Sequence, residues 1–320
     1  NNGESYTNNT VVTLSLSSTD ADYMRFSNDN STWTVYEGYS SSKSYTLPTG
    51  DGVKTVYVQF KDIAGNEAVS VSDTIQLDTT APILSNISIA SNNTTPNLAK
   101  PSNVVTLSFT ANEPIRSPSV VFTSGGNSIN DTIDYTNTSN NDWTASYTTD
   151  GRDDEGPVGF TIDYDDLAGN SGQQVTTTTD STSVTFDKTV PTLTTVSIAS
   201  NNTLDTSVAG PGNRITLTIA ASEPLKWAHG NAPGLRVAFQ TGTTTVDPNT
   251  IGYYVAGTPL YQYWSVIYDP SGDIHEGGGV QFTINYSDTA GNLGIPVTTT
   301  TDLTFVTFDK TLPTGNTISI

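Results

Sequence analysis

The sequence predicts an all-β protein made of consecutive β-sandwich domains, and three observations lead to this prediction. Apolar and polar residues alternate over short runs such as Val104–Phe109, which is the period of a half-buried strand. Clusters of Gly, Asn, Asp and Pro separate these runs, and no segment has a helical period with caps. Blocks of sequence also recur in the same order along the 320 residues.

Composition and charge exclude several classes of function. The net charge of −20, with 12 Lys and Arg against 32 Asp and Glu, disfavours nucleic acid and anionic membranes, since both are polyanions. The absence of Cys excludes disulfides, Cys-ligated metals and Cys nucleophiles. No apolar run approaches the ~20 residues of a membrane helix, so we expect no membrane insertion within this segment. An acidic, extracellular or surface-exposed protein is the expectation.

Three related blocks mark the repeat. Val184-Thr-Phe-Asp-Lys-Thr-Val-Pro191 recurs as Val306-Thr-Phe-Asp-Lys-Thr-Leu-Pro313, and Ile75-Gln-Leu-Asp-Thr-Thr-Ala-Pro82 is a weaker copy. Residues 88–94 and 197–203 both read Ser-Ile-Ala-Ser-Asn-Asn-Thr. Such self-similarity indicates consecutive copies of one structural unit. We therefore expect domains at 1–78, 79–187 and 188–309, the last with longer loops, then a linker and the first strand of a following domain or next subunit at 310–320.

Within each domain, about seven short strands in roughly 100 residues are typical of an immunoglobulin-like (Ig-like) β-sandwich, with a partly open barrel as the alternative. The first domain opens in what should be the turn before the strand at Val11–Leu16, so it is expected to lack its own first strand. Trp33, Trp143 and Trp264 are expected to serve the core.

The repeat blocks carry a resemblance to a known group of proteins. Tyr23-Met-Arg-Phe-Ser-Asn-Asp29 and Gly50-Asp-Gly-Val-Lys-Thr-Val-Tyr-Val-Gln-Phe-Lys-Asp-Ile-Ala-Gly-Asn66 resemble the bacterial Ig-like repeats of large cell-surface proteins and adhesins. The later domains, with a Glu-Pro turn, an Ala-Gly-Asn turn and Val-Thr-Phe-Asp-Lys-Thr, resemble another group of such repeats. The resemblance covers nearly the whole chain, is specific for repeat type and weak for function. It implies an extracellular location, a tandem arrangement and often Ca²⁺-stiffened linkers.

The two ends of the sequence read as parts of one domain. Ile318-Ser319-Ile320 followed by Asn1-Asn2-Gly3 makes a strand and a turn, so the 320 residues are expected to be one period of a longer assembly. In one version, a covalent tandem repeat continues. In the other, residues 313–320, with the assembly strand Ile318, Ser319 and Ile320, complete the open sheet of another copy by donor-strand complementation. An arbitrary boundary is the alternative.

Carboxylates are predicted to gather at the domain junctions, because Ig-like topology places the B–C and F–G loops at the pole where the chain enters. Ca²⁺ takes six to eight oxygen ligands, and converging carboxylates repel one another without a cation. The alternative is that these residues only form turns. The candidate ligands are Asp78, Glu113, Asp166, Asp153, Asp154, Glu155, Asp187, Glu223, Asp288, Asp269, Asp273, Glu276 and Asp309.

The third domain has an aromatic insertion that offers a different function. Trp227 and Tyr263 could stack on sugar rings and make this domain a glycan-binding adhesin tip, although such aromatics more often pack locally. No catalytic constellation or phosphate-binding loop is present. We therefore expect a non-enzymatic extension protein of a surface fibre or adhesin stalk, assembling end to end with copies of itself. A surface-binding module and a noncatalytic fragment of a polysaccharide-active enzyme are the alternatives.

Overall fold

The computed structural model describes residues 3–139, 141–227, 234–241, 244–245, 251–255, 261–270, 278–315 and 317–318. These residues form strands, turns and loops without helices, which confirms the predicted all-β class. They contain no helical segment with the length and hydropathy of a membrane span. The chain divides into two compact units, of which unit 1 is Asn1–Ala90, Val104–Thr148 and Gly156–Val184, and unit 2 is Ser91–Asn103, Thr149–Glu155 and Thr185–Ile320.

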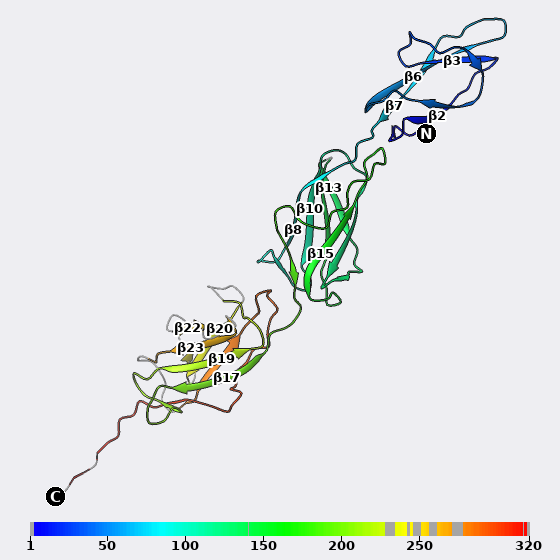
Figure 1. Cartoon of the computed structure of the whole chain (residues 1–320). Helices are drawn as coiled ribbons and strands as arrows, with labels where there is room; N and C mark the ends of the chain where they lie inside the picture. Colours follow the sequence, from blue (N-terminus) through cyan, green and yellow to red (C-terminus); the bar gives the residue numbers. More distant parts are fainter. Residues whose placement is uncertain are drawn as a thin grey trace. The chain divides into compact units, whose positions relative to one another are not determined.

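Unit 1 begins with a sandwich of unequal sheets (Figure 1). Alternation within its longest strand, β6 (Gly52–Lys61), buries Val56, Val58 and Phe60 against Met24 and Phe26. The smaller sheet is the antiparallel pair β2 (Val11–Ser15) and β5 (Ser42–Thr46). The larger sheet has the order β1 (Tyr6–Thr7), β7 (Val71–Leu77), β6, β3 (Tyr23–Ser27) and β4 (Glu37–Gly38), with β1 parallel to β7.

The remaining strands of unit 1 form two further layers, in which Leu107, Phe109, Phe122 and Ile162 are buried. One layer has the order β13 (Asp134–Ser139), β14 (Asp142–Thr148), β10 (Val104–Ala111) and β8 (Leu84–Ser91). The other contains β12 (Asn127–Ser128), β11 (Ser119–Ser124) and β15 (Gly156–Asp163).

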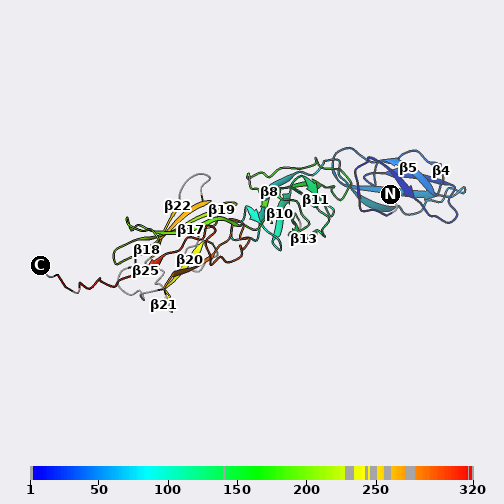
Figure 2. The same ribbon diagram turned by 90° about the horizontal axis from the view of Figure 1, so that it is seen from below.

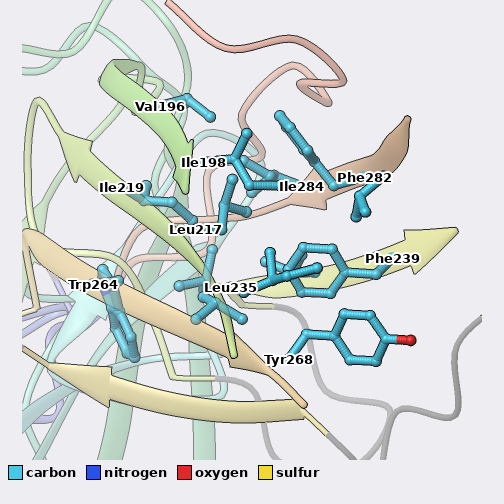
Figure 3. Packing of buried hydrophobic residues seen from close by; sticks show 14 of the residues in the cluster. Val196, Ile198, Leu217, Ile219, Leu235, Phe239, Trp264, Tyr268, Phe282 and Ile284 are labelled. Atoms are coloured by element: carbon cyan, nitrogen blue, oxygen red, sulfur yellow. The ribbon is translucent and has the colours of Figure 1, made fainter. Parts of the chain in front are cut away.

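Unit 2 repeats the same arrangement around its own core. One sheet has the order β17 (Leu193–Ser200), β19 (Ile215–Ala221), β23 (Tyr263–Tyr268) and β22 (Ile251–Val255). The facing sheet has β20 (Arg236–Thr241) between β21 (Thr244–Thr245) and β24 (Val280–Asn285). Phe239, Trp264 and Phe282 fill the space between the sheets (Figure 3).

Short parallel pairs complete this pattern. In unit 2, β18 (Val208–Ala209) pairs with β25 (Thr307–Phe308), as Figure 2 shows, and β9 (Leu98–Ala99) pairs with β16 (Thr185–Phe186). They are the equivalents of β1 with β7 in unit 1.

The strand orders establish the Ig-like sandwich over the open barrel. Both β8-β10-β14-β13 and β17-β19-β23-β22 match the A-B-E-D sheet of that fold. The predicted boundaries at residues 78, 187 and 309 stay predictions. Trp264 lies in the core as predicted, whereas Trp143 is only half-buried. Trp33 is also half-buried, and the Arg25 guanidinium lies 5.0 Å from its ring centroid.

Candidate functional site: two acidic triads

Two equivalent groups of three carboxylates form in the structure. In unit 1, carboxylate oxygens of Asp78, Glu113 and Asp166 lie within 4.8 Å of one another, and this group is called the first triad. In unit 2, Asp187, Glu223 and Asp288 do the same and form the second triad. The structure thus brings together the linker Asp, the Glu of the B–C loop and the Asp of the F–G loop, as the sequence predicted. Whether these groups hold a cation stays a prediction.

The first triad is positioned by the ends of three segments. Asp78 follows β7, and its backbone N–H donates to the Thr7 carbonyl over 2.9 Å. Asp166 begins the turn after β15, where its Oδ1 accepts from the backbone N–H groups of Gly169 at 2.6 Å and Asn170 at 2.8 Å. Gly169 has a φ of +93°, which favours glycine. The turn interpretation therefore holds for Asp166, and the same turn directs its carboxylate into the triad.

The second triad repeats this geometry in unit 2. Asp288 Oδ1 accepts from the N–H groups of Gly291 at 2.6 Å and Asn292 at 2.9 Å. The Asn292 side-chain amide donates to Asp288 Oδ2 at 2.8 Å and to the Asp187 carbonyl at 3.0 Å. Both Asp166 and Asp288 are only 1% exposed. The repeat therefore places one deeply buried carboxylate at each linker.

Asn170 and Asn292 hold the linkers to these turns, a role that the sequence prediction missed. The Asn170 side-chain amide donates to the Asp78 carbonyl at 2.9 Å, as Asn292 does to Asp187. Each amide thus ties the backbone of the linker Asp to the turn that carries the buried Asp. The signal in the sequence was the recurrence of Ala-Gly-Asn, whose Asn is more than a turn former.

Burial, together with electrostatic repulsion within the triads, raises carboxylate pKa values. Burial, followed by the negative charges of Asp187 and Asp288, raises the pKa of Glu223 to about 7. Burial and the charges of Asp78 and Asp166 raise the pKa of Glu113. Burial and the charge of Asp288 likewise raise the pKa of Asp187. The fully ionised state of each triad is therefore unfavourable unless a positive charge lies beside it.

No protein cation neutralises either triad in the part of the chain that the structure describes. Lys188, next to Asp187 in sequence, instead donates from Nζ to the carbonyl oxygens of Gly151 at 3.1 Å and Asp153 at 2.6 Å. Glu223 Oε1 is buried and accepts no hydrogen bond from a described residue. A buried carboxylate oxygen without a donor is costly, so this atom calls for a ligand outside the chain.

A fourth carboxylate at each linker binds the backbone instead. Asp51 Oδ1 accepts from the Thr79 N–H at 2.9 Å, and Glu155 Oε1 accepts from the Lys188 N–H at 2.9 Å. Hydrogen bonds from Thr80 and Thr79 lower the pKa of Asp51, and a bond from Thr189 lowers that of Glu155. Glu155, predicted as a ligand, is thus not one of the three grouped carboxylates of the second triad, and its Oε1 accepts from the Lys188 N–H and the Thr189 hydroxyl.

The other predicted ligands lie elsewhere. Asp153 is buried, and its Oδ2 accepts from the Asp150 N–H at 2.9 Å. Asp309 accepts from the Thr311 N–H at 2.9 Å, and Asp154 and Asp269 are exposed. Asp273 and Glu276 lie outside the described residues, as do Ser319 and Ile320 of the predicted assembly strand.

Of the two aromatic residues of the predicted glycan site, Trp227 belongs to a partly exposed group of rings. Trp227 and Tyr263 are 40% and 43% exposed. The Trp227 ring lies 5.3 Å from that of buried Trp264, and the Tyr261 ring lies 5.9 Å from it on centroids. Trp227 therefore covers a core residue with one face and presents the remainder of its surface to solvent.

Comparison with known proteins yields weak structural likeness only. No family model matches the chain, and no curated protein matches it. An I-band fragment of titin matches with a TM-score of 0.37 at 12% identity, covering 96% of this chain and 95% of that one. The full ectodomain (Ig1–Ig3) of mouse nectin-like molecule 4 matches with a TM-score of 0.30 at 12% identity, covering 97% and 98%.

Proposed function

We propose that this chain is a non-enzymatic extracellular spacer whose two acidic triads each bind Ca²⁺. The observation that carries the proposal is the recurrence of one arrangement in both units: a linker Asp, a Glu of raised pKa and a buried Asp, with no basic partner among the described residues. Chance turn formation accounts for a buried Asp in a loop. It does not account for three carboxylates meeting twice in the same way.

The donor set suits Ca²⁺ better than softer metals. Each triad supplies carboxylate oxygens alone, and Ca²⁺ is a hard cation that completes its shell with carbonyl, amide and water oxygens. Extracellular Ca²⁺ modules bind with dissociation constants of about 10⁻⁴–10⁻³ M, which match a site with few preformed ligands. The acidic composition and the resemblance to bacterial surface repeats support an extracellular setting.

Bound Ca²⁺ would stiffen the linkers by a direct electrostatic effect. Asp78 and Asp187 belong to linker segments, whereas the other triad members belong to the loops after β10 and β15 and after β19 and β24. A cation shared by all three carboxylates replaces repulsion with attraction and so restrains the linker against these loops. A restrained linker is what a spacer that holds a partner away from a cell surface requires.

The test is the response of thermal unfolding to Ca²⁺ in the full chain. We expect the midpoint temperatures of unfolding of both units, each of which contains one triad, to rise on addition of Ca²⁺ and to fall with EGTA. Glu113→Gln should remove the Ca²⁺ response of one transition and Glu223→Gln that of the other. The control, Asp205→Asn, removes an exposed charge whose Oδ1 serves a local turn with Ser207. Unfolding that is the same in Ca²⁺ and EGTA would contradict the proposal.

A second candidate function is carbohydrate binding by the partly exposed aromatics of unit 2. Trp227, Tyr261 and Tyr263 are partly exposed, and the rings of Trp227 and Tyr261 lie beside that of Trp264. Glycan-array binding by the chain, abolished by Tyr263→Ala, would support it. Array signals equal to those of an unrelated protein would contradict carbohydrate binding.

A further inference from the structure

Two segments of the chain have closely related sequences but different surface chemistry. Residues 171–184 read Ser-Gly-Gln-Gln-Val-Thr-Thr-Thr-Thr-Asp-Ser-Thr-Ser-Val, and residues 293–306 read Leu-Gly-Ile-Pro-Val-Thr-Thr-Thr-Thr-Asp-Leu-Thr-Phe-Val. Every difference places an apolar residue in the second segment where the first has a polar one. The apolar residues introduced in this way are Leu293, Ile295, Pro296, Leu303 and Phe305.

Equivalent hydrogen bonds hold both segments along the edge of a sandwich. The Thr301 N–H donates to the Val196 carbonyl of β17 at 2.8 Å. Val297 exchanges two backbone hydrogen bonds with Ile284 of β24. Segment 293–306 therefore runs along the edges of both sheets of its sandwich. Segment 171–184 makes the same bonds to β8 and β15, through Thr179 with Ile87 and Val175 with Ile162.

Four of the introduced apolar side chains lie open to solvent. The exposed fraction is 69% for Leu293, 79% for Ile295, 87% for Leu303 and 62% for Phe305. These four residues are called the apolar edge. A single exposed apolar side chain is ordinary in a folded protein, but several large ones on one edge mark an interaction surface.

Leu303 is unfavourable in its own sandwich for two reasons. Its φ is +62°, in the left-handed region that disfavours a bulky side chain, and Ser181 has a φ of +61° at the equivalent position. Leu303 is also the most exposed member of the apolar edge. A leucine at this position stabilises the molecule only if something outside the sandwich covers it.

The surroundings of the apolar edge carry little charge. Asp302 is the only charged residue in segment 293–306, and β17 and β24, beside which this segment lies, contain none. The chain as a whole has a net charge of −20, so two copies repel each other over most of their surface. This edge is therefore where a second copy can approach at the lowest electrostatic cost, whereas a basic partner would be attracted to the acidic loops.

We propose that the apolar edge binds the apolar edge of a second copy of this chain in a two-fold dimer. A two-fold axis through the threonines at 298–301 would set Leu293 and Ile295 of one copy beside Leu303 and Phe305 of the other, so the surface is complementary to itself. Segment 171–184 carries Ser and Gln instead, so association is confined to one sandwich. The inference goes beyond calcium binding, and no member of either triad takes part in it.

Sedimentation velocity of the full chain over a range of concentrations tests the proposal. The wild type should show a reversible monomer–dimer equilibrium. Phe305→Ser should raise the dissociation constant of the dimer about a hundredfold, because a two-fold dimer buries this side chain twice. The control Leu204→Ser replaces a leucine of the same unit that is 94% exposed and lies outside the apolar edge, so it should leave the dimer unchanged.

Exchanging residues between the two segments separates loss of association from loss of folding. One variant combines Leu293→Ser, Ile295→Gln, Leu303→Ser and Phe305→Ser. It copies residues that segment 171–184 already holds with the same hydrogen bonds. It should therefore stay monomeric and, at concentrations where the wild type is also monomeric, melt no lower than the wild type.

The reverse exchange combines Ser171→Leu, Gln173→Ile, Ser181→Leu and Ser183→Phe. It should produce species larger than a dimer, because each chain then carries two apolar edges. A wild-type chain that stays monomeric, equal dissociation constants for the wild type and the first exchange variant, or loss of the dimer in Leu204→Ser would overturn the proposal. The wild-type dimer should also form in EGTA, so failure of the calcium sites would leave this test intact.

Discussion

Glu223→Gln is expected to stabilise unit 2 without Ca²⁺ and to destabilise it, relative to wild type, with Ca²⁺. In the wild type, Glu223 faces Asp187 and Asp288 and has a buried oxygen without a hydrogen-bond donor. Gln keeps the size of the side chain and removes its charge. Without a cation the substitution therefore relieves repulsion, and with one it removes a ligand.

The magnitude follows from the pKa of Glu223, which rises from 4.5 to about 7. Unscreened, such a shift corresponds to about 3 kcal/mol at high pH. Because Glu223 is half-buried, solvent screening reduces the expected gain for Glu223→Gln in EGTA to about 1 kcal/mol, or about 4 °C in Tm for a domain of this size. Conversely, Ca²⁺ at 100 times its dissociation constant stabilises the wild type by about 2.7 kcal/mol.

Differential scanning calorimetry of the full chain at pH 8 measures both effects. The expected pattern is a crossover, with Glu223→Gln melting above wild type in EGTA and below it when Ca²⁺ is present at about 100 times the wild-type dissociation constant. Asp205→Asn removes one charge from the same unit outside the triad and should show no crossover. A Glu223→Gln variant that melts below wild type under both conditions would refute the reasoning, because it would show that the Glu223 carboxylate contributes favourable contacts without a cation.

Two further predictions concern pH and the segment that contains Asp187. In EGTA, the free energy of unfolding of unit 2 should fall as the pH rises from 5 to 8. The pKa of Glu223 is about 7 in the folded chain and 4.5 when unfolded, so its protonation stabilises the fold fully below pH 4.5, and this contribution is lost as the pH rises through about 7. Glu223→Gln should flatten this pH dependence, measured by urea unfolding. Asn292→Ala should lower the free energy of unfolding by about 1–3 kcal/mol in the same assay, because it removes the amide donor to Asp288 and to the Asp187 carbonyl. The control Asn66→Ala, at an exposed turn, should lower it by less. Equal losses would contradict the proposed role of Asn292 in holding the segment of Asp187.

The strands and the repeat were predictable from the sequence because both are local or periodic signals. Alternation identified Val104–Phe109 as a strand, and the copies of Val-Thr-Phe-Asp-Lys-Thr identified the repeat. Two-sheet topology then placed Glu113 and Asp166 near Asp78 and gave the correct grouping of both triads. Position along a known topology is thus enough to predict which loops meet.

Side-chain hydrogen bonding was not predictable at that level. Glu155 and Asp166 look alike in the sequence as acids near a predicted linker, and both accept backbone hydrogen bonds, but Asp166 joins a triad and Glu155 does not. The choice depends on ångström-scale distances between loop atoms, which strand periodicity does not specify. The role of Asn292 was missed for the same reason, since an Asn in a turn ordinarily serves only its own loop.

Isothermal titration calorimetry of the full chain with Ca²⁺ at pH 8 tests the central claim most directly. The account predicts two Ca²⁺ ions bound per wild-type chain, one in Glu223→Gln or Glu113→Gln, and none in the double variant. Wild-type protein that binds no Ca²⁺, or a double variant that binds as much as wild type, would contradict it.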